Sequence, residues 1–78
     1  MHTTAERLRR LRAERFMSQA DLAKASGVGP ASIARIELGI VTPRAGTVRK
    51  LAQALNVPPG DVMDPAELLE RRPGKEAA

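Results

Sequence analysis

Residues 19–38 read QADLAKASGVGPASIARIEL, and this stretch decides the fold. Counting from Gln19, a small residue stands at the fifth position, a glycine at the ninth, and apolar residues at the fourth, tenth, fifteenth and eighteenth. Two short helices that cross through a tight turn need a small residue where their backbones approach and a glycine where the chain turns. The apolar positions bury the inner faces of both helices. Because six positions agree, the stretch predicts a helix-turn-helix. The six are Leu22, Ala23, Gly27, Val28, Ile33 and Ile36.

Helix boundaries follow from capping residues around this stretch. Ser18 is an N-cap residue for a second helix that runs to Ser26, and Gly27 ends it because glycine adopts the left-handed conformation at no cost. Pro30 suits the first position of a third helix, where its missing N–H has no partner to lose. Gly39 ends the third helix, and Asn56 ends a later one.

The flanking segments are helical as well. Apolar stripes predict a first helix over about residues 3–15 and a fourth over 45–55. The stripes are Ala5, Leu8 and Leu11 in the first case and Val48, Leu51, Ala52 and Leu55 in the second. VPPGDVM (57–63) predicts a short fifth helix with three core candidates, which are Val57, Val62 and Met63.

The C-terminal end carries one more helix signal. Asp64, Pro65 and Glu67 occupy the N-cap, first and third positions of a helix that extends to about Arg72, and the tail after it frays. No alternating strand pattern and no repeat competes. The predicted fold is all-α, a domain over residues 1–64 followed by a C-terminal helix and tail over 65–78.

Composition limits the class of protein. A chain of 78 residues without cysteine forms one small domain held by apolar packing. It contains no apolar run of about 20 residues and no signal-peptide core, so we expect a cytoplasmic protein away from membranes. Residues 1–50 hold ten Lys and Arg against four Asp and Glu, whereas residues 51–78 hold three against five. The basic half either faces a polyanion or solvates the first helix.

The segment from Leu8 to Met63 resembles the Cro/C1 phage-repressor type of helix-turn-helix domain, also called the XRE family. Its clearest pieces are SQADLA, the spacing of SIARIELG, Pro43 and KLAQALNV. The resemblance implies a compact five-helix, lambda-repressor-like domain whose second helix bridges the DNA backbone while the third enters the major groove. It also implies a sequence-specific regulator of transcription, a repressor, that binds double-stranded DNA.

Six residues match positions that face DNA in this family. They are Gln19, Pro30, Ala31, Ser32, Arg35 and Arg44. Arg35 is the best base reader, since its planar fork bonds guanine O6 and N7 together, whereas Ala31 meets only a thymine methyl. Gln19 and Arg44 match phosphate contacts, and Ser32 suits a phosphate or a base edge.

Other matched residues are structural, and some depart from the family. The resemblance pairs Glu37 with Arg12 of the first helix and gives Glu37 no role toward DNA. Phe16 replaces the usual glycine, so either the backbone is strained there or the first helix runs on, and the ring packs locally. Leu38 and the pair Ile40-Val41 replace polar or basic residues, which lowers the expected affinity for DNA.

Two functional hypotheses remain open. Since one domain offers few base contacts, a homodimer on a palindromic operator is expected, joined through the C-terminal region Val57–Leu69. The alternative is a protein-interaction module that kept the fold and uses its apolar surface. His2 stands alone and the serines lack an adjacent histidine, so we expect no enzyme, no metal, no cofactor and no small-molecule ligand.

Overall fold

The computed structural model describes residues 3–70, and within them the backbone forms six helices and no strand. The helices are α1 (Thr4–Glu14), α2 (Gln19–Ser26), α3 (Pro30–Glu37), α4 (Ala45–Leu55), α5 (Pro59–Val62) and α6 (Pro65–Glu70). The predicted all-α fold is therefore confirmed. The predicted extension of the last helix to Arg72, the tail after it and His2 lie outside the described residues.

Side-chain caps fix where the first two helices begin. Thr3 and Ser18 each accept a hydrogen bond from the backbone N–H three residues later. In return, the carboxylates of Glu6 and Asp21 accept a hydrogen bond from the backbone N–H of the cap residue. The pKa of Asp21 lies below its usual value, chiefly because its carboxylate accepts the backbone N–H of Ser18. The predicted N-cap at Ser18 is confirmed.

Positive φ angles mark where helices end. Gly27 (φ 78°), Gly39 (φ 76°) and Asn56 (φ 60°) take the left-handed conformation at the predicted stops after α2, α3 and α4. An added Cβ at Gly27 or Gly39 meets no atom within 4 Å, so backbone conformation and not space requires glycine there.

Phe16 departs from the prediction in one respect. Its φ is 54°, so α1 ends before it and the backbone keeps the strained conformation, which costs a non-glycine residue about 1–2 kcal/mol. The expectation that its ring packs locally is wrong, because the side chain is 96% exposed. Met17 is the residue of this link that packs against the core instead.

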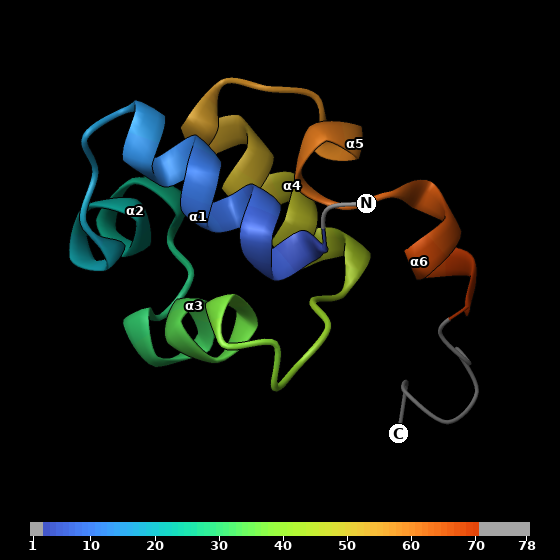
Figure 1. The fold of residues 1–78 in the computed structure, drawn as a ribbon. Coiled ribbons are helices and arrows are strands. Elements are labelled where there is room, and N and C mark those ends of the chain that lie inside the picture. Colours follow the sequence, from blue (N-terminus) through green and yellow to red (C-terminus); the bar gives the residue numbers. More distant parts are fainter. Residues whose placement is uncertain (1–2, 71–78) are drawn as a thin grey trace.

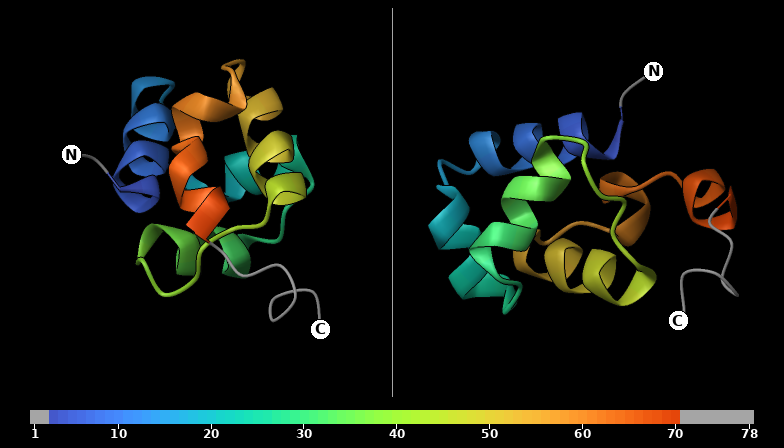
Figure 2. Two further views of the ribbon diagram at one scale, coloured as in Figure 1. Left: turned by 90° about the vertical axis from the view of Figure 1, so that its right-hand side faces the viewer. Right: turned by 90° about the horizontal axis from the view of Figure 1, so that it is seen from below.

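The first five helices enclose one core (Figures 1 and 2). α1 packs against α3 and α5, α4 packs against α2 and α5, and α2 packs against α3. α6 extends beyond this body at the right of Figure 1. Thr4 Oγ1 donates a hydrogen bond of 2.9 Å to Glu67 Oε1, which ties α6 to the start of α1.

The core confirms most of the predicted apolar positions. Its buried residues are Leu8, Leu22, Val28, Ile33, Ile36, Val48, Leu51, Ala52, Leu55, Val62 and Met63. Three predicted members are only partly buried and pack against its edge, namely Leu11, Ala23 and Val57. Ala5, the other predicted member of the α1 stripe, is also only partly buried.

Candidate nucleic-acid interface

The turn between α2 and α3 sets the direction of the exposed helix. Gly27 reverses the chain, Val28 turns inward and is buried, and Gly29 is extended with φ −60° before Pro30 opens α3. Ile33 and Ile36 then hold the inner face of α3 in the core at 0% and 3% exposure. The opposite face of α3 must therefore lie at the surface.

The residues of α3 that were predicted to face DNA all lie on that outer face. Pro30, Ala31, Ser32 and Arg35 are all exposed. Among residues 3–70, Arg35 has no hydrogen-bond or ion-pair partner, so its guanidinium keeps its five donors for a ligand. Arg44 is also exposed and is the N-cap residue of α4.

Gln19 differs from the other predicted contacts because it is half-buried at the start of α2. Its Nε2 donates a hydrogen bond of 3.0 Å to Glu37 Oε1 at the end of α3. No local sequence pattern indicates this contact, since the two residues stand 18 positions apart and on different helices. Gln19 therefore bonds within the fold while part of its side chain remains at the surface.

Glu37 is the acceptor at the centre of a buried polar cluster. Arg12 Nε and Nη2 approach its two carboxylate oxygens at 2.8 and 2.9 Å, and only 3% of the Glu37 side chain is exposed. Burial raises the pKa of Glu37, but hydrogen bonds from Arg12 and Gln19 outweigh burial, so the pKa lies below its usual value. The pKa of Arg12 is raised, chiefly by its hydrogen bonds to Glu37.

The arginines of α1 and its C-cap residue Arg15 have a role that the sequence did not indicate. Arg9 donates to the backbone oxygen of Glu37, and Arg15 Nε donates at 2.8 Å to the backbone oxygen of Leu55. Both oxygens belong to the last residue of a helix, where carbonyls lack a helical partner and attract positive charge. Arg7 Nη1 reaches the oxygen of Gly60 in α5 at 3.2 Å. These arginines neither simply solvate α1 nor point freely to a polyanion; they join α1 to α3, α4 and α5.

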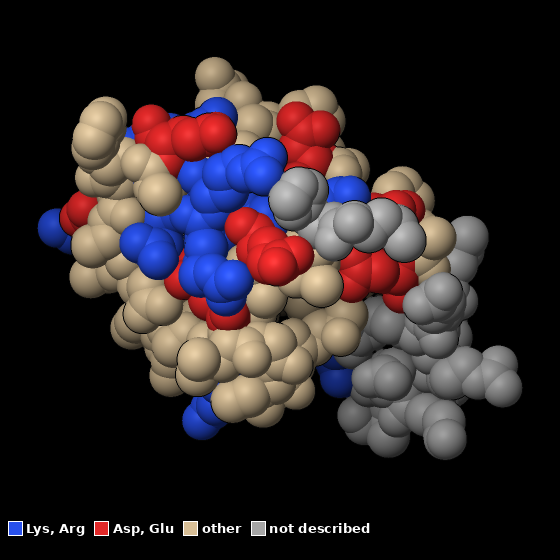
Figure 3. Space-filling view, in the orientation of Figure 1, with Lys and Arg blue, Asp and Glu red and all other residues tan. Residues whose placement is uncertain are grey.

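Surface charge is accordingly uneven. Lys and Arg gather over α1 in the middle of the face shown in Figure 3, interspersed with acidic side chains, whereas the lower part over α3 is largely neutral. Beside that region, Leu38, Ile40 and Val41 are 72%, 67% and 42% exposed. The candidate interface thus combines few cations with an apolar margin.

Two other kinds of site find no support in residues 3–70. No group of three or more His, Cys, Asp or Glu side chains in this part of the chain is arranged to hold a metal ion. None of the described helices is both long and apolar enough to cross a membrane.

Known proteins match the stretch that forms this interface. A protein-family model described as helix-turn-helix matches residues 8–62. The chain is also 42% identical over 71 residues to a protein of Bacillus subtilis (strain 168) named HTH-type transcriptional repressor RghR. That alignment covers 90% of the chain and 53% of the relative, so the chain spans about half the length of the curated relative it matches.

Proposed function

Because the chain belongs to the Cro/C1-type, or XRE, family of helix-turn-helix proteins, we propose that it is a DNA-binding regulator of transcription that acts as a repressor. α3 enters the major groove of double-stranded DNA and α2 spans the backbone. The observation that carries the proposal is the outer face of α3, where Arg35 is exposed and unpaired among the described residues. Pro30, Ala31 and Ser32 lie on the same face and approach the bases with it.

Two arginines have separable roles in this proposal. Arg35→Ala is expected to weaken binding to the preferred sequence by about 1–3 kcal/mol and to relax one base position, because a bidentate contact to guanine is lost. Arg44→Ala is expected to weaken all duplexes alike, since Arg44 contacts a phosphate. Selection of bound sequences from random duplexes, followed by titration of each variant, measures both effects. An unchanged base preference after Arg35→Ala would show that another residue reads the bases.

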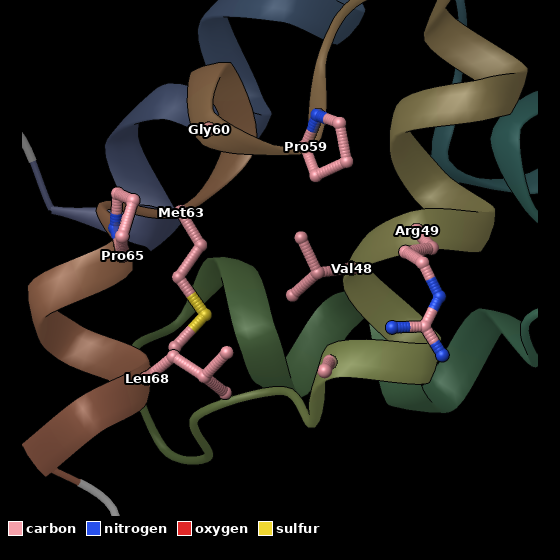
Figure 4. Close-up of a pocket in the computed structure, with 8 residues that line it drawn as sticks. Val48, Arg49, Pro59, Gly60, Met63, Pro65 and Leu68 are labelled. Carbon is pink, nitrogen blue, oxygen red and sulfur yellow. The ribbon is translucent and has the colours of Figure 1, made fainter.

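The proposal includes a homodimer on a palindromic operator, with two copies of α3 about 34 Å apart. A hollow of about 250 Å³ where α4, α5 and α6 meet supports it, and residues of the predicted surface Val57–Leu69 line part of this hollow (Figure 4). Figure 4 shows Val48, Met63 and Leu68 around the hollow. Ligand pockets begin at about 300 Å³, so the hollow better suits an inserted apolar side chain than a small molecule. A second copy offers its own Leu68, which is 38% exposed.

Leu68→Lys is expected to raise the dimer dissociation constant about tenfold or more, because a charged group enters the apolar contact. Phe16→Lys is the matched control, since Phe16 is an exposed apolar residue on the link between α1 and α2. Sedimentation equilibrium of each variant, with and without operator, gives the association state. A wild-type protein that stays monomeric on its operator at saturating concentration contradicts the dimer.

A second candidate function has its own observation. Leu38, Ile40 and Val41 form an exposed apolar margin beside α3, and such margins mark protein contacts. A protein-interaction module would use this margin and would not bind duplex DNA. Titration with duplex DNA at increasing salt separates the two functions. DNA binding gives a log K that falls along log salt by about 0.9 per phosphate contacted, whereas the alternative gives no binding at low salt.

A further inference from the structure

Glu37 lies inside the fold yet bonds directly to a residue at the start of α2. Its Oε2 accepts from Arg12 Nε at 2.8 Å, whereas its Oε1 accepts both from Arg12 Nη2 at 2.9 Å and from Gln19 Nε2 at 3.0 Å. The carboxylate is 3% exposed, so a DNA phosphate has no route to it. Glu37 can therefore act on a DNA contact only at long range through its charge or through the side chains that it bonds, Gln19 and Arg12.

The chemistry of Glu37 decides how the Gln19 amide is turned. An ionised carboxylate is an acceptor only, so it requires the amide nitrogen of Gln19 and excludes the amide oxygen. Rotating the amide by 180° would bring two acceptors together in a buried place, which costs about 1–3 kcal/mol. One N–H of Gln19 is used by Glu37, and among residues 3–70 the other has no acceptor, so it is available to a ligand.

The same cluster holds the backbone that precedes α2. Arg12 Nη1 donates a hydrogen bond of 2.8 Å to the carbonyl oxygen of Met17, the residue before the N-cap Ser18. Gln19 is therefore restrained on two sides, by its own side chain and by the link that leads into α2. A side chain fixed in this way loses little freedom when it binds a ligand.

We propose that Glu37 is a positioning residue for DNA binding, which holds the Gln19 amide so that its remaining N–H meets a phosphate. The proposal rests on the proposed DNA-binding function. It gives Glu37 a role toward DNA, where the sequence indicated a purely structural one. Because a phosphate contact carries no sequence information, a random-sequence duplex is a sufficient probe, and the operator need not be known.

The direction in which Glu37→Gln changes the affinity for DNA separates positioning from simple electrostatics. Glu37→Gln removes a negative charge, so long-range attraction alone predicts tighter binding to DNA. Positioning predicts the opposite, an affinity about 3- to 10-fold weaker, because the new amide can accept from the Gln19 nitrogen or donate to the Gln19 oxygen and so no longer sets its orientation. Gln19→Ala is expected to weaken binding by a similar factor. Neither change removes a contacting cation, so the salt dependence should keep its slope.

A double-mutant cycle completes the test. Wild type, Gln19→Ala, Glu37→Gln and the double variant are titrated against a 20-base-pair duplex by fluorescence anisotropy, after circular dichroism shows that each is folded. In the Gln19→Ala background, Glu37→Gln is expected to cause no further weakening. Two exposed residues supply the controls. Glu14→Gln makes the same charge change on α1 and Gln53→Ala removes a glutamine from α4, and neither should weaken binding.

Several results would overturn the proposal. Equal weakening by Glu37→Gln in both backgrounds, or tighter binding than wild type, leaves Glu37 with a structural role only. Failure of the wild-type protein to bind any duplex refutes the proposed function and this inference with it. If Glu37→Gln does not fold, the side-chain N–H signals of Gln19 in nitrogen-15-labelled wild type decide. One signal should move when duplex is added while the other stays, and two unmoved signals contradict the proposal.

Discussion

Arg12→Ala is expected to lower the free energy of unfolding by about 3–5 kcal/mol, because it leaves a buried carboxylate without its main partner. Glu37 is 3% exposed and cannot regain water, and the single bond from Gln19 does not replace the two that Arg12 supplies. The link before α2 also loses its bond to the Met17 carbonyl. Since small domains have a total stability of about 5–15 kcal/mol, this variant should be close to unfolding.

Glu37→Ala should cost less than Arg12→Ala. The Arg12 side chain is 20% exposed, so its guanidinium can turn partly toward water when the carboxylate is gone. Urea denaturation followed by circular dichroism measures both values, and Lys50→Ala, which removes an exposed cation from α4, serves as the control. If Arg12→Ala and Glu37→Ala lower the free energy of unfolding equally, the difference in burial between the two side chains does not determine the cost.

Ile33→Ala is expected to destabilise the protein by about 2–5 kcal/mol, because it leaves a cavity beneath the helix that we propose reads DNA. Ile33 is fully buried, and it is one of the two residues that hold α3 to the core through its inner face. Its loss should loosen α3 as well as the core. DNA affinity is therefore expected to fall even at temperatures where the variant remains folded.

A graded series checks this prediction. Ile33→Val removes one methylene and should cost about 0.5–1.5 kcal/mol. Leu38→Ala, just past the end of α3, removes more atoms than Ile33→Val does. It should nevertheless change stability by less than about 0.5 kcal/mol, since Leu38 is 72% exposed. Chemical denaturation of the three variants gives the series. A cost for Leu38→Ala equal to that of Ile33→Ala would mean that the exposed residue packs against something.

Local rules predicted the positions of the helices. Ser18 and Gly27 act on their immediate neighbours, so their effect on helix ends is legible in the sequence. Phe16 shows where such rules fail. The residue type predicts a ring that packs, but the left-handed backbone places the ring in solvent.

The contacts around the candidate interface were harder to predict because they join residues far apart in the chain. The reader positions of α3 follow from helical spacing once Ile33 and Ile36 are placed inside. The partner of Gln19 and the carbonyls bound by Arg9 and Arg15 depend on how three helices meet, and no sequence spacing encodes them. From the sequence, the basic residues of α1 either faced a polyanion or solvated the helix, whereas in the structure Arg7, Arg9 and Arg12 are bonded within the protein.

The bonds made by α1 also bear on how the chain folds. Arg15 reaches residue 55 and Arg7 reaches residue 60, separations of 40 and 53 positions. During synthesis, α1 cannot complete these contacts until the last third of the domain has been made. The chain also loses the entropy of closing these long loops before the contacts can stabilise it. Folding should accordingly be all-or-none rather than stepwise from the N-terminus. A peptide comprising residues 19–38 alone should not hold its two helices together, because their supports lie on both sides of it in the chain.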